Sequence, residues 1–312
     1  MESLFVTFLI IAAFLPKSTD INSVVLKYDY KNNFRAHLSL SKSIDLPYRA
    51  RGAPIFDASQ ITAQSAMAVD EKTGKILFEK NSYNKQSIAS LTKLMTAIVW
   101  LERDGGLNKE IEIKNEDIRE GGIAYFLAGE KIKAKDLLYA GLIGSSNMAM
   151  AALARNTTTS TEEFVSLMNK KAKELGMENT RFKDPTGLDY HNISTASDIY
   201  LLMKEAFGRQ EIYKATQLSA YNFYPLGKGY PRAVKNTNWL LNSSLNSGAY
   251  KIVVGKTGYI EESNYNLALR VYNSEKNRNI AVIILGSADK QSRFIEAKKL
   301  TEWVFGNYIW QI

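Results

Sequence analysis

The chain has 312 residues, of which 45% are hydrophobic and 23% are charged, a composition typical of a folded globular protein. It contains no cysteine, which excludes a disulfide framework, a thiol nucleophile and a cysteine-ligated metal site. Only His37 and His191 could supply a catalytic histidine, so the base of any hydrolase is expected to be Lys, Asp or Glu. The net charge of +8 allows an anionic partner, but the sequence has no nucleic-acid-binding motif, and we expect no nucleic-acid partner.

Two segments precede the expected folded domain. Residues 4–15 form an apolar run, which is shorter than the roughly 20 residues of a membrane-spanning helix and typical of the core of a signal peptide. Residues 1–20 are therefore predicted to be a signal peptide or an uncleaved N-terminal anchor that associates with the membrane, with a buried strand or helix as the alternative. Residues 21–58 are polar and irregular and are predicted to be a linker or arm. The folded domain is predicted over 59–312, exported to the periplasm or to the outer face of the cell membrane.

The folded domain is predicted to begin with a hairpin and a helix. Residues 65–70 and 75–79 are typical of strands, and the turn at 71–74 joins them. A helix is predicted over 90–102, because apolar side chains recur there at helical spacing, namely Leu91, Leu94, Ile98 and Leu101.

Helices are predicted for the middle of the chain, and strands return at its end. A helical region is predicted over 134–175, with a break at 144–147. Three strands and a final helix follow, over residues 251–255, 265–272, 280–286 and 291–305. This order predicts an α/β (α+β) fold, in which one antiparallel sheet is covered by helices and carries a helical insertion that forms the second wall of a cleft.

Ser90 and Lys93 open the first predicted helix in the pattern Ser-Leu-Thr-Lys. Residues three apart lie on one face of a helix, so the two side chains are expected within hydrogen-bonding distance. A serine hydroxyl becomes a good nucleophile when a neighbouring base takes its proton, and lysine can be that base only when it is uncharged. The pKa of Lys93 would have to fall by about 3 units, a change that burial and nearby positive charge can produce. The alternative role of Ser90 is a helix N-cap.

Ser145, Ser146 and Asn147 lie at the predicted break between two apolar helical runs. A hydroxyl and a carboxamide on a tight turn can face a cleft. There Ser145 could pass a proton between Lys93 and a leaving amine, and Asn147 could bind a substrate amide. The alternative is that these side chains cap a helix.

Lys256, Thr257 and Gly258 follow the apolar strand predicted at 251–255. An edge strand can hold an extended peptide by backbone pairing, and a glycine in it allows close approach. Lys256 and Thr257 could bind a substrate carboxylate, and the charge of Lys256 would help to keep Lys93 neutral. The same triplet recurs in the predicted hairpin turn at 71–74, where we interpret it as structural.

The order of these three motifs resembles that of the low-molecular-mass penicillin-binding proteins, which are serine D-Ala-D-Ala carboxypeptidases and D,D-endopeptidases. The resemblance covers about residues 64–308 and includes further matching stretches, at residues 88–97, 175–182, 184–189, 194–198 and 236–238. It implies a β-lactamase/transpeptidase-like fold and hydrolysis of peptidoglycan stem peptides or cross-links. It also implies that β-lactam antibiotics inhibit covalently, and that no metal or organic cofactor takes part.

The resemblance implies a role for each matching residue of the first two motifs. Ser90 would form the acyl-enzyme, with Lys93 as its base. Ser145 and Asn147 would relay protons and orient the substrate.

The third motif, residues 256–258, is expected to bind the end of the substrate that carries a carboxylate. By the same resemblance, Lys256 and Thr257, next to Gly258, would bind the substrate carboxylate or its equivalent. The oxyanion hole would be formed by the backbone N–H groups of Ser90 and Tyr259, each typically contributing about 3–4 kcal/mol.

Two features distinguish this chain from many carboxypeptidases of that family. Ser146 stands where they commonly have glycine, which could change the substrate preference. The sequence also ends soon after the last predicted helix, without the β-rich domain and amphipathic anchor that many of them add. These features, together with residues 186–188 and 191–195, favour the D,D-endopeptidase branch, although carboxypeptidase activity stays open.

Two other functions compete with this prediction. A class A β-lactamase needs a glutamate that activates the deacylating water, and the closest stretch, at residues 238–242, has Asn238 in its place. A non-catalytic peptidoglycan-binding or sensor protein could keep the same fold. It would have no need of the nucleophile and the two lysines, Ser90, Lys93 and Lys256, that this sequence retains.

Overall fold

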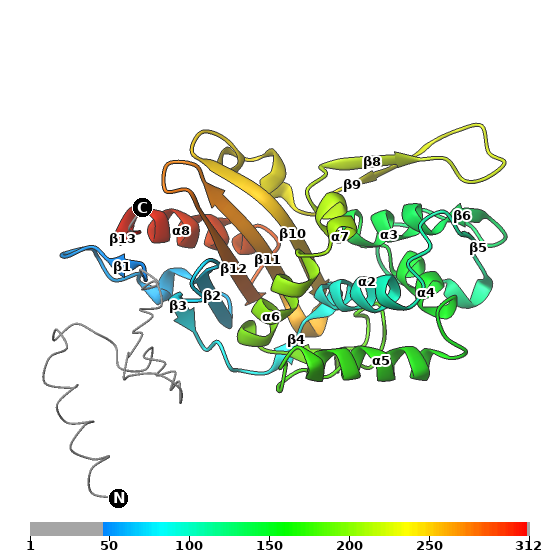
Figure 1. Cartoon of the computed structure of the whole chain (residues 1–312), viewed down its shortest axis with the longest axis horizontal. Coiled ribbons are helices and arrows are strands. Elements are labelled where there is room, and N and C mark those ends of the chain that lie inside the picture. Colours follow the sequence, from blue (N-terminus) through cyan, green and yellow to red (C-terminus); the bar gives the residue numbers. More distant parts are fainter. Residues whose placement is uncertain (1–45, 311–312) are drawn as a thin grey trace, which may run out of the picture. The chain divides into compact units, whose positions relative to one another are not determined.

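The computed structural model describes residues 46–310, and its centre is a five-stranded antiparallel sheet (Figure 1). In spatial order its strands are β10 (Tyr250–Ile260), β11 (Asn264–Asn273), β12 (Arg278–Ser287), β2 (Ser65–Asp70) and β3 (Ile76–Lys80). The predicted α/β (α+β) arrangement is therefore confirmed. β10 is longer than predicted, because its pairing with β11 continues past Gly255 to Ile260.

Helices cover both faces of this sheet (Figure 1). α8 (Ser292–Asn307) packs on one face, and α6 (Ala196–Ala206) packs on the other. The helical side of the molecule is completed by α2 (Thr92–Arg103), α3 (Ala134–Ile143), α4 (Asn147–Arg155), α5 (Thr161–Glu174) and α7 (Gln210–Thr216). Paired short strands link the remaining segments: β1 (Tyr48–Arg49) with β13 (Tyr308–Ile309), β4 (Gln86–Ser87) with β7 (Ile193–Ser194), β5 (Glu110–Glu112) with β6 (Lys131–Lys133), and β8 (Ala220–Phe223) with β9 (Arg232–Lys235).

The alternation of side chains along the central strands produces two apolar cores. In β12, Ile280, Val282 and Ile284 belong to the core that contains α8, whereas Ala281 and Ile283 belong to the core on the helical side. Successive side chains of a strand point to opposite faces of a sheet. Because both faces are covered, β12 is apolar almost without interruption, which explains why it was readily recognised as a strand.

The helical region predicted over 134–175 has two breaks rather than one. The first follows Gly144, as expected, and the second lies between Arg155 and Thr161. At the second break, Asn156 Nδ2 donates a hydrogen bond to the carbonyl of Ala152 at the end of α4. Such short polar side chains compete for backbone groups and favour helix ends, which interrupts an otherwise helical pattern.

The compact domain begins upstream of Ser59. β1 pairs with β13 near the C-terminus, and Phe56 packs edge-on against Phe78 and Trp303, with ring centroids 5.1 and 5.4 Å apart. Residues 46–58, which the sequence assigns to the arm, are thus packed on the domain. The expectations for residues 1–20 and 21–45 lie outside the described residues. Within 46–310, every helix is too short or too polar to cross a bilayer.

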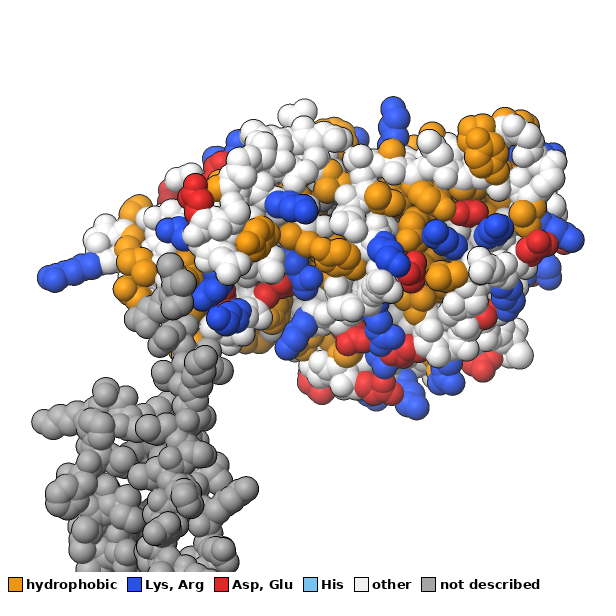
Figure 2. Space-filling model, turned by 45° about the horizontal axis from the view of Figure 1, so that its top comes forward, with side chains coloured by type: hydrophobic (Ala, Val, Ile, Leu, Met, Phe, Trp, Pro, Cys, Tyr) orange, Lys and Arg blue, Asp and Glu red, His pale blue; other side chains and the backbone are white. Residues whose placement is uncertain are grey.

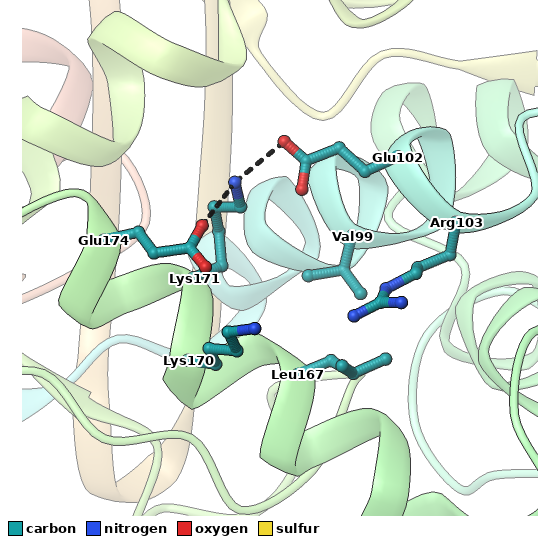
Figure 3. A pocket seen from close by; sticks show the side chains of 7 residues that line it. All are labelled: Val99, Glu102, Arg103, Leu167, Lys170, Lys171 and Glu174. Carbon is teal, nitrogen blue, oxygen red and sulfur yellow. Dashed lines mark ion pairs between the residues drawn. The ribbon is translucent and has the colours of Figure 1, made fainter.

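An ion-pair network ties α2 to α5 (Figure 3). Lys171 Nζ lies 2.9 Å from Glu102 Oε1 on α2 and 2.8 Å from Glu174 Oε2 on its own helix. Arg209 also pairs with Glu102. Lys171 and Arg209 are partly buried and the two glutamates are exposed, so the network contributes only modestly to stability.

We predict that Arg155→Met will lower the free energy of unfolding by about 3 kcal/mol, because it leaves a buried carboxylate without its partner. Arg155 donates two hydrogen bonds of 2.8 Å to Asp117, whose side chain is 1% exposed. The measurement is urea denaturation followed by circular dichroism. The matched control is Lys109→Ala, which breaks an exposed pair with Asp104 and should cost about 1 kcal/mol or less. If both variants lose the same free energy of unfolding, the buried pair of Arg155 and Asp117 stabilises the fold no more than the exposed pair does.

Candidate active site

Ser90 and Lys93 meet at the start of α2. Ser90 lies in a short 3-10 turn (Ala89–Leu91), in which Ala89 has a φ of +46°, and α2 follows directly. The Nζ atom of Lys93 lies 2.6 Å from Ser90 Oγ and donates a 2.5 Å hydrogen bond to the carbonyl of Thr186. The structure thus brings together the serine and lysine of the predicted pair, at the helix start that the sequence indicated.

The environment of Lys93 favours its neutral form. The side chain is fully buried, and burial lowers the pKa of Lys93 to about 7, while the negative charge of Asp184 acts in the opposite direction. A neutral amine has a lone pair that can accept the proton of the neighbouring hydroxyl. Its position beside the hydroxyl and its lowered pKa would allow Lys93 to act as a general base near neutral pH.

The segment between α3 and α4 brings the predicted Ser145 into contact with Lys256, whereas the predicted Asn147 contacts the segment at 120–121. Ser145 has a φ of +59°, and its Oγ accepts a 2.8 Å hydrogen bond from Lys256 Nζ. Ser146 is the N-cap of α4, where its Oγ accepts from the backbone N–H of Ala149. Of the two serines, Ser146 thus has the capping role, and Ser145 is free to face the lysine. Asn147 donates from Nδ2 to the carbonyls of Glu120 and Gly121 at 3.3 Å each.

Lys256 is the second buried lysine of the site. It is 1% exposed, and its Nζ also donates to the carbonyl of Thr257 at 2.9 Å. Burial lowers the pKa of Lys256 well below its usual value, and the positive charges of Lys93 and Arg293 lower it further. The side chain of Thr257 is hydrogen-bonded to Thr237, with 2.6 Å between the two Oγ1 atoms.

Two glycines allow the backbone around Ser90 to be approached closely. A Cβ at Gly258 would lie 2.8 Å from the carbonyl oxygen of Ile88 and 3.2 Å from the backbone N of Ser90. A Cβ at Gly187, whose φ is +87°, would lie 2.1 Å from the carbonyl oxygen of Ala89. Only glycine fits in both places, so the edge of β10 and the loop at Gly187 both lie against the segment that carries Ser90.

Tyr259 follows Gly258 at the edge of the same strand. Its side chain is 50% exposed, and its ring stacks on Tyr265 with a centroid distance of 4.3 Å. Tyr259 pairs with Tyr265 across the sheet and directly follows Gly258, which approaches the backbone of Ser90 closely.

Three contributors to the site lie outside the predicted site residues. They are the carbonyl of Thr186, the hydroxyl of Thr237 and the guanidinium of Arg293. Arg293 is 4% exposed, donates a 3.0 Å hydrogen bond to the carbonyl of Gly258, and has a pKa lowered by burial to about 10. The stretches at residues 184–189 and 236–238, which contain Thr186 and Thr237, do match the family. A backbone carbonyl such as that of Thr186 has no residue-type signal, however, and the sequence around Arg293 indicates only a helix.

The second Lys-Thr-Gly triplet is structural, as interpreted. It forms the turn between β2 and β3, where Asp70 Oδ2 accepts hydrogen bonds from the backbone and hydroxyl of Thr73, and Gly74 has a φ of +74°. On the face seen in Figure 2, Lys and Arg side chains are dispersed among Asp and Glu side chains.

We predict that Gly187→Ala will lower the free energy of unfolding by more than about 3 kcal/mol. The new Cβ would overpack against Ala89, and this cost adds to that of a left-handed backbone conformation in alanine. The matched control is Gly176→Ala, since Gly176 has a φ of +75° but no atom within 4 Å of its Cβ position. Thermal unfolding of both variants measures the difference, and the control should lose only about 1–2 kcal/mol. If the two variants unfold at the same temperature, the close approach at Ala89 does not constrain the fold.

Known proteins resemble this chain in sequence. Residues 52–288 match the family described as D-alanyl-D-alanine carboxypeptidase. A D-alanyl-D-alanine endopeptidase of Haemophilus influenzae is 38% identical over 240 residues, which cover 76% of this chain and 80% of that protein. A D-alanyl-D-alanine endopeptidase of Pseudomonas aeruginosa is 32% identical over 250 residues, 78% of each protein. A D-alanyl-D-alanine carboxypeptidase of Bacillus subtilis is 34% identical over 256 residues, 79% of this chain and 63% of that protein.

Solved structures share the fold. The DD-transpeptidase of Streptomyces K15 superposes with a TM-score of 0.72 at 26% identity, over 81% of this chain and 99% of that one. Penicillin-binding protein D2 of Listeria monocytogenes, in its cefotaxime-bound form, gives a TM-score of 0.69 at 26% identity, with the same coverage. The expected β-lactamase/transpeptidase-like fold is thereby confirmed. With the family match extending over most of the described domain, the chain belongs to the D-alanyl-D-alanine carboxypeptidase family of serine peptidases.

Proposed function

We propose that the chain is an exported serine D,D-peptidase that hydrolyses peptidoglycan peptides through an acyl-enzyme on Ser90. The observation that carries the proposal is the fully buried Lys93, whose Nζ lies 2.6 Å from Ser90 Oγ and whose pKa is lowered to about 7. The same arrangement supports catalysis over mere binding, because a binding protein has no use for a desolvated lysine next to a serine.

In the acylation step, neutral Lys93 takes the proton of the Ser90 hydroxyl while Ser90 Oγ attacks the carbonyl carbon of the scissile peptide bond. The carbonyl oxygen becomes an oxyanion, and the backbone N–H groups of Ser90 and Tyr259 receive it. The close approach of Gly258 to the backbone N of Ser90 supports this pairing, since Tyr259 is the next residue of the strand. A single donor of this kind typically contributes about 3–4 kcal/mol to transition-state stabilisation.

Breaking the C–N bond requires a proton on the leaving amine. Lys93 holds the proton from Ser90, and Ser145, hydrogen-bonded to Lys256 at 2.8 Å, passes it on to the amine. Asn147 orients the substrate by its carboxamide. A water molecule then attacks the acyl-enzyme, Lys93 again accepts a proton, and the product leaves with a new carboxylate while Ser90 regains its hydrogen.

The buried guanidinium of Arg293, beside Lys256, supplies positive charge that suits an anionic substrate group. Lys256 and the buried Arg293 lie close enough for Arg293 to lower the pKa of Lys256. Thr257, held by its hydrogen bond to Thr237, adds a hydroxyl beside them. A substrate carboxylate bound there would neutralise part of this charge and gain charge-assisted hydrogen bonds.

Within this activity we favour D,D-endopeptidase over carboxypeptidase. The curated endopeptidases are 31–38% identical to this chain over 78–88% of their own length. The curated carboxypeptidases are 28–34% identical over 61–63% of theirs. Both activities form the same acyl-enzyme and differ only in the leaving amine, so the site geometry accommodates either.

Export and domain organisation complete the proposal. Residues 1–20 act as a signal peptide or membrane anchor, a linker follows, and the catalytic domain acts in the periplasm or at the outer face of the cell membrane, where its substrate lies. β-Lactams are proposed to acylate Ser90, in line with the cefotaxime-bound Listeria penicillin-binding protein among the structural relatives.

We expect the protein to cleave cross-linked muropeptide dimers into monomers, and the Ser90→Ala variant to cleave none, because it lacks the attacking oxygen. The measurement is chromatography of the products, with circular dichroism to show that the variant is folded. A monomeric pentapeptide assayed in parallel separates the two activities. Release of D-alanine from the pentapeptide with intact dimers would favour carboxypeptidase, and turnover by folded Ser90→Ala would refute the nucleophile.

The acylation rate should depend on pH through Lys93. Since its neutral form is the active one and its pKa is about 7, the second-order rate constant should level off above about pH 8 and fall about tenfold per unit well below pH 7. A fluorescent penicillin, with fluorescence followed over time from pH 5 to 9, gives this profile. A flat profile down to pH 5 would exclude a base with the pKa of Lys93.

A further inference from the structure

One carboxylate organises the loop that faces Lys93. The two oxygens of Asp184 accept hydrogen bonds from Thr186, through its backbone N and its Oγ1 at 2.5 Å each, and from the backbone N of Gly187 at 2.9 Å. They also accept from the backbone N of Asp189 at 2.8 Å and from Nδ2 of Asn192 at 3.2 Å. A carboxylate with this many donors fixes the loop backbone around itself.

This loop is hydrogen-bonded to one face of α2. The carbonyl of Thr186 accepts from Lys93, and the carbonyl of Pro185 accepts from Thr96 Oγ1 at 2.6 Å. Nδ2 of Asn192 also donates to Thr92 Oγ1 at 3.1 Å. The position of the Thr186 carbonyl against Lys93 therefore depends on the fold of the loop, and the fold of the loop depends on Asp184.

Asp184 also places a negative charge near the buried Lys93. Within residues 46–310, the negative charge of Asp184 on the loop acts on Lys93, and the positive charges of Lys93 and of Arg293 on α8 act on Lys256. Burial disfavours a proton on Lys93, and the charge of Asp184 favours one.

We propose that Asp184 is a positioning residue, which holds the Thr186 carbonyl against Lys93 and keeps one negative charge beside the lysine pair so that Lys93 can retain the proton it takes from Ser90. A general base works best when its pKa lies near the working pH. Without Asp184, Lys93 would remain neutral but would hold the transferred proton more weakly. This inference rests on the proposed function, because it assigns Lys93 as the base.

The test compares the pH profile of acylation by a fluorescent penicillin in the parent protein and in Asp184→Asn. Removing the negative charge should move the low-pH limb of the profile to lower pH by about one unit, and should lower the plateau rate, since a nearby opposite charge typically shifts a pKa by about 1–3 units. Asn192→Ala is the matched control. It loosens the same loop without removing charge, so it should lower the rate and the unfolding temperature and leave the limb in place.

Each outcome decides between the alternatives. A folded Asp184→Asn whose limb coincides with that of the parent would overturn the charge role, and so would the same shift in Asn192→Ala. If Asp184→Asn does not fold, Asp184→Ser is the second neutral variant, since its hydroxyl can still accept from Gly187, and the same limb shift is required of it. Failure of the parent to form any acyl-enzyme would instead reject the proposed function itself.

Discussion

The active site depends on the burial of two lysine side chains beside one serine. Taking an ammonium group out of water is costly, and the protein reduces that cost by letting the lysine lose its proton. Lys93 and Lys256 are both almost completely buried, and the pKa of each is lowered. Because Lys93 loses its proton instead of being buried with its charge, it is available as a base near neutral pH.

The rest of the fold serves to hold these groups in place. The five-stranded sheet brings Lys256 to its edge, and the break between α3 and α4 turns Ser145 toward it. Gly258 and Gly187 allow β10 and the loop to lie directly against the segment of Ser90. Because each contact comes from a different element, the site forms only when the sheet and the helices are packed together.

The sequence was most informative where a residue type carries both the structure and the chemistry. The alternating and continuous apolar patterns predicted the sheet, including β12, and the Ser-x-x-Lys spacing predicted the pair at the start of α2. It also separated the two Lys-Thr-Gly triplets, because the first lies in a hairpin turn between two strands. The extension of β10 to Ile260 was missed, since the ladder with β11 continues through residues that do not look like a strand.

What could not be predicted are contacts made by groups without a sequence signature. Thr186 acts through its backbone carbonyl, and the ordering of its loop by Asp184 depends on a network of turns. Arg293 reaches the site from α8, whose sequence pattern marks only a core-packing helix. The division of roles between Ser145 and Ser146 also required the structure, because either serine could have been the helix cap.

The central claim is that Ser90 is acylated with Lys93 as its base. The most direct test is the intact mass of the purified protein after incubation with benzylpenicillin, followed by peptide mapping, for the parent and for Ser90→Ala and Lys93→Ala. The account predicts one covalent adduct on the parent, located at Ser90, with none on Ser90→Ala and little on Lys93→Ala over the same time. An adduct at another residue, or full acylation of folded Lys93→Ala, would contradict it.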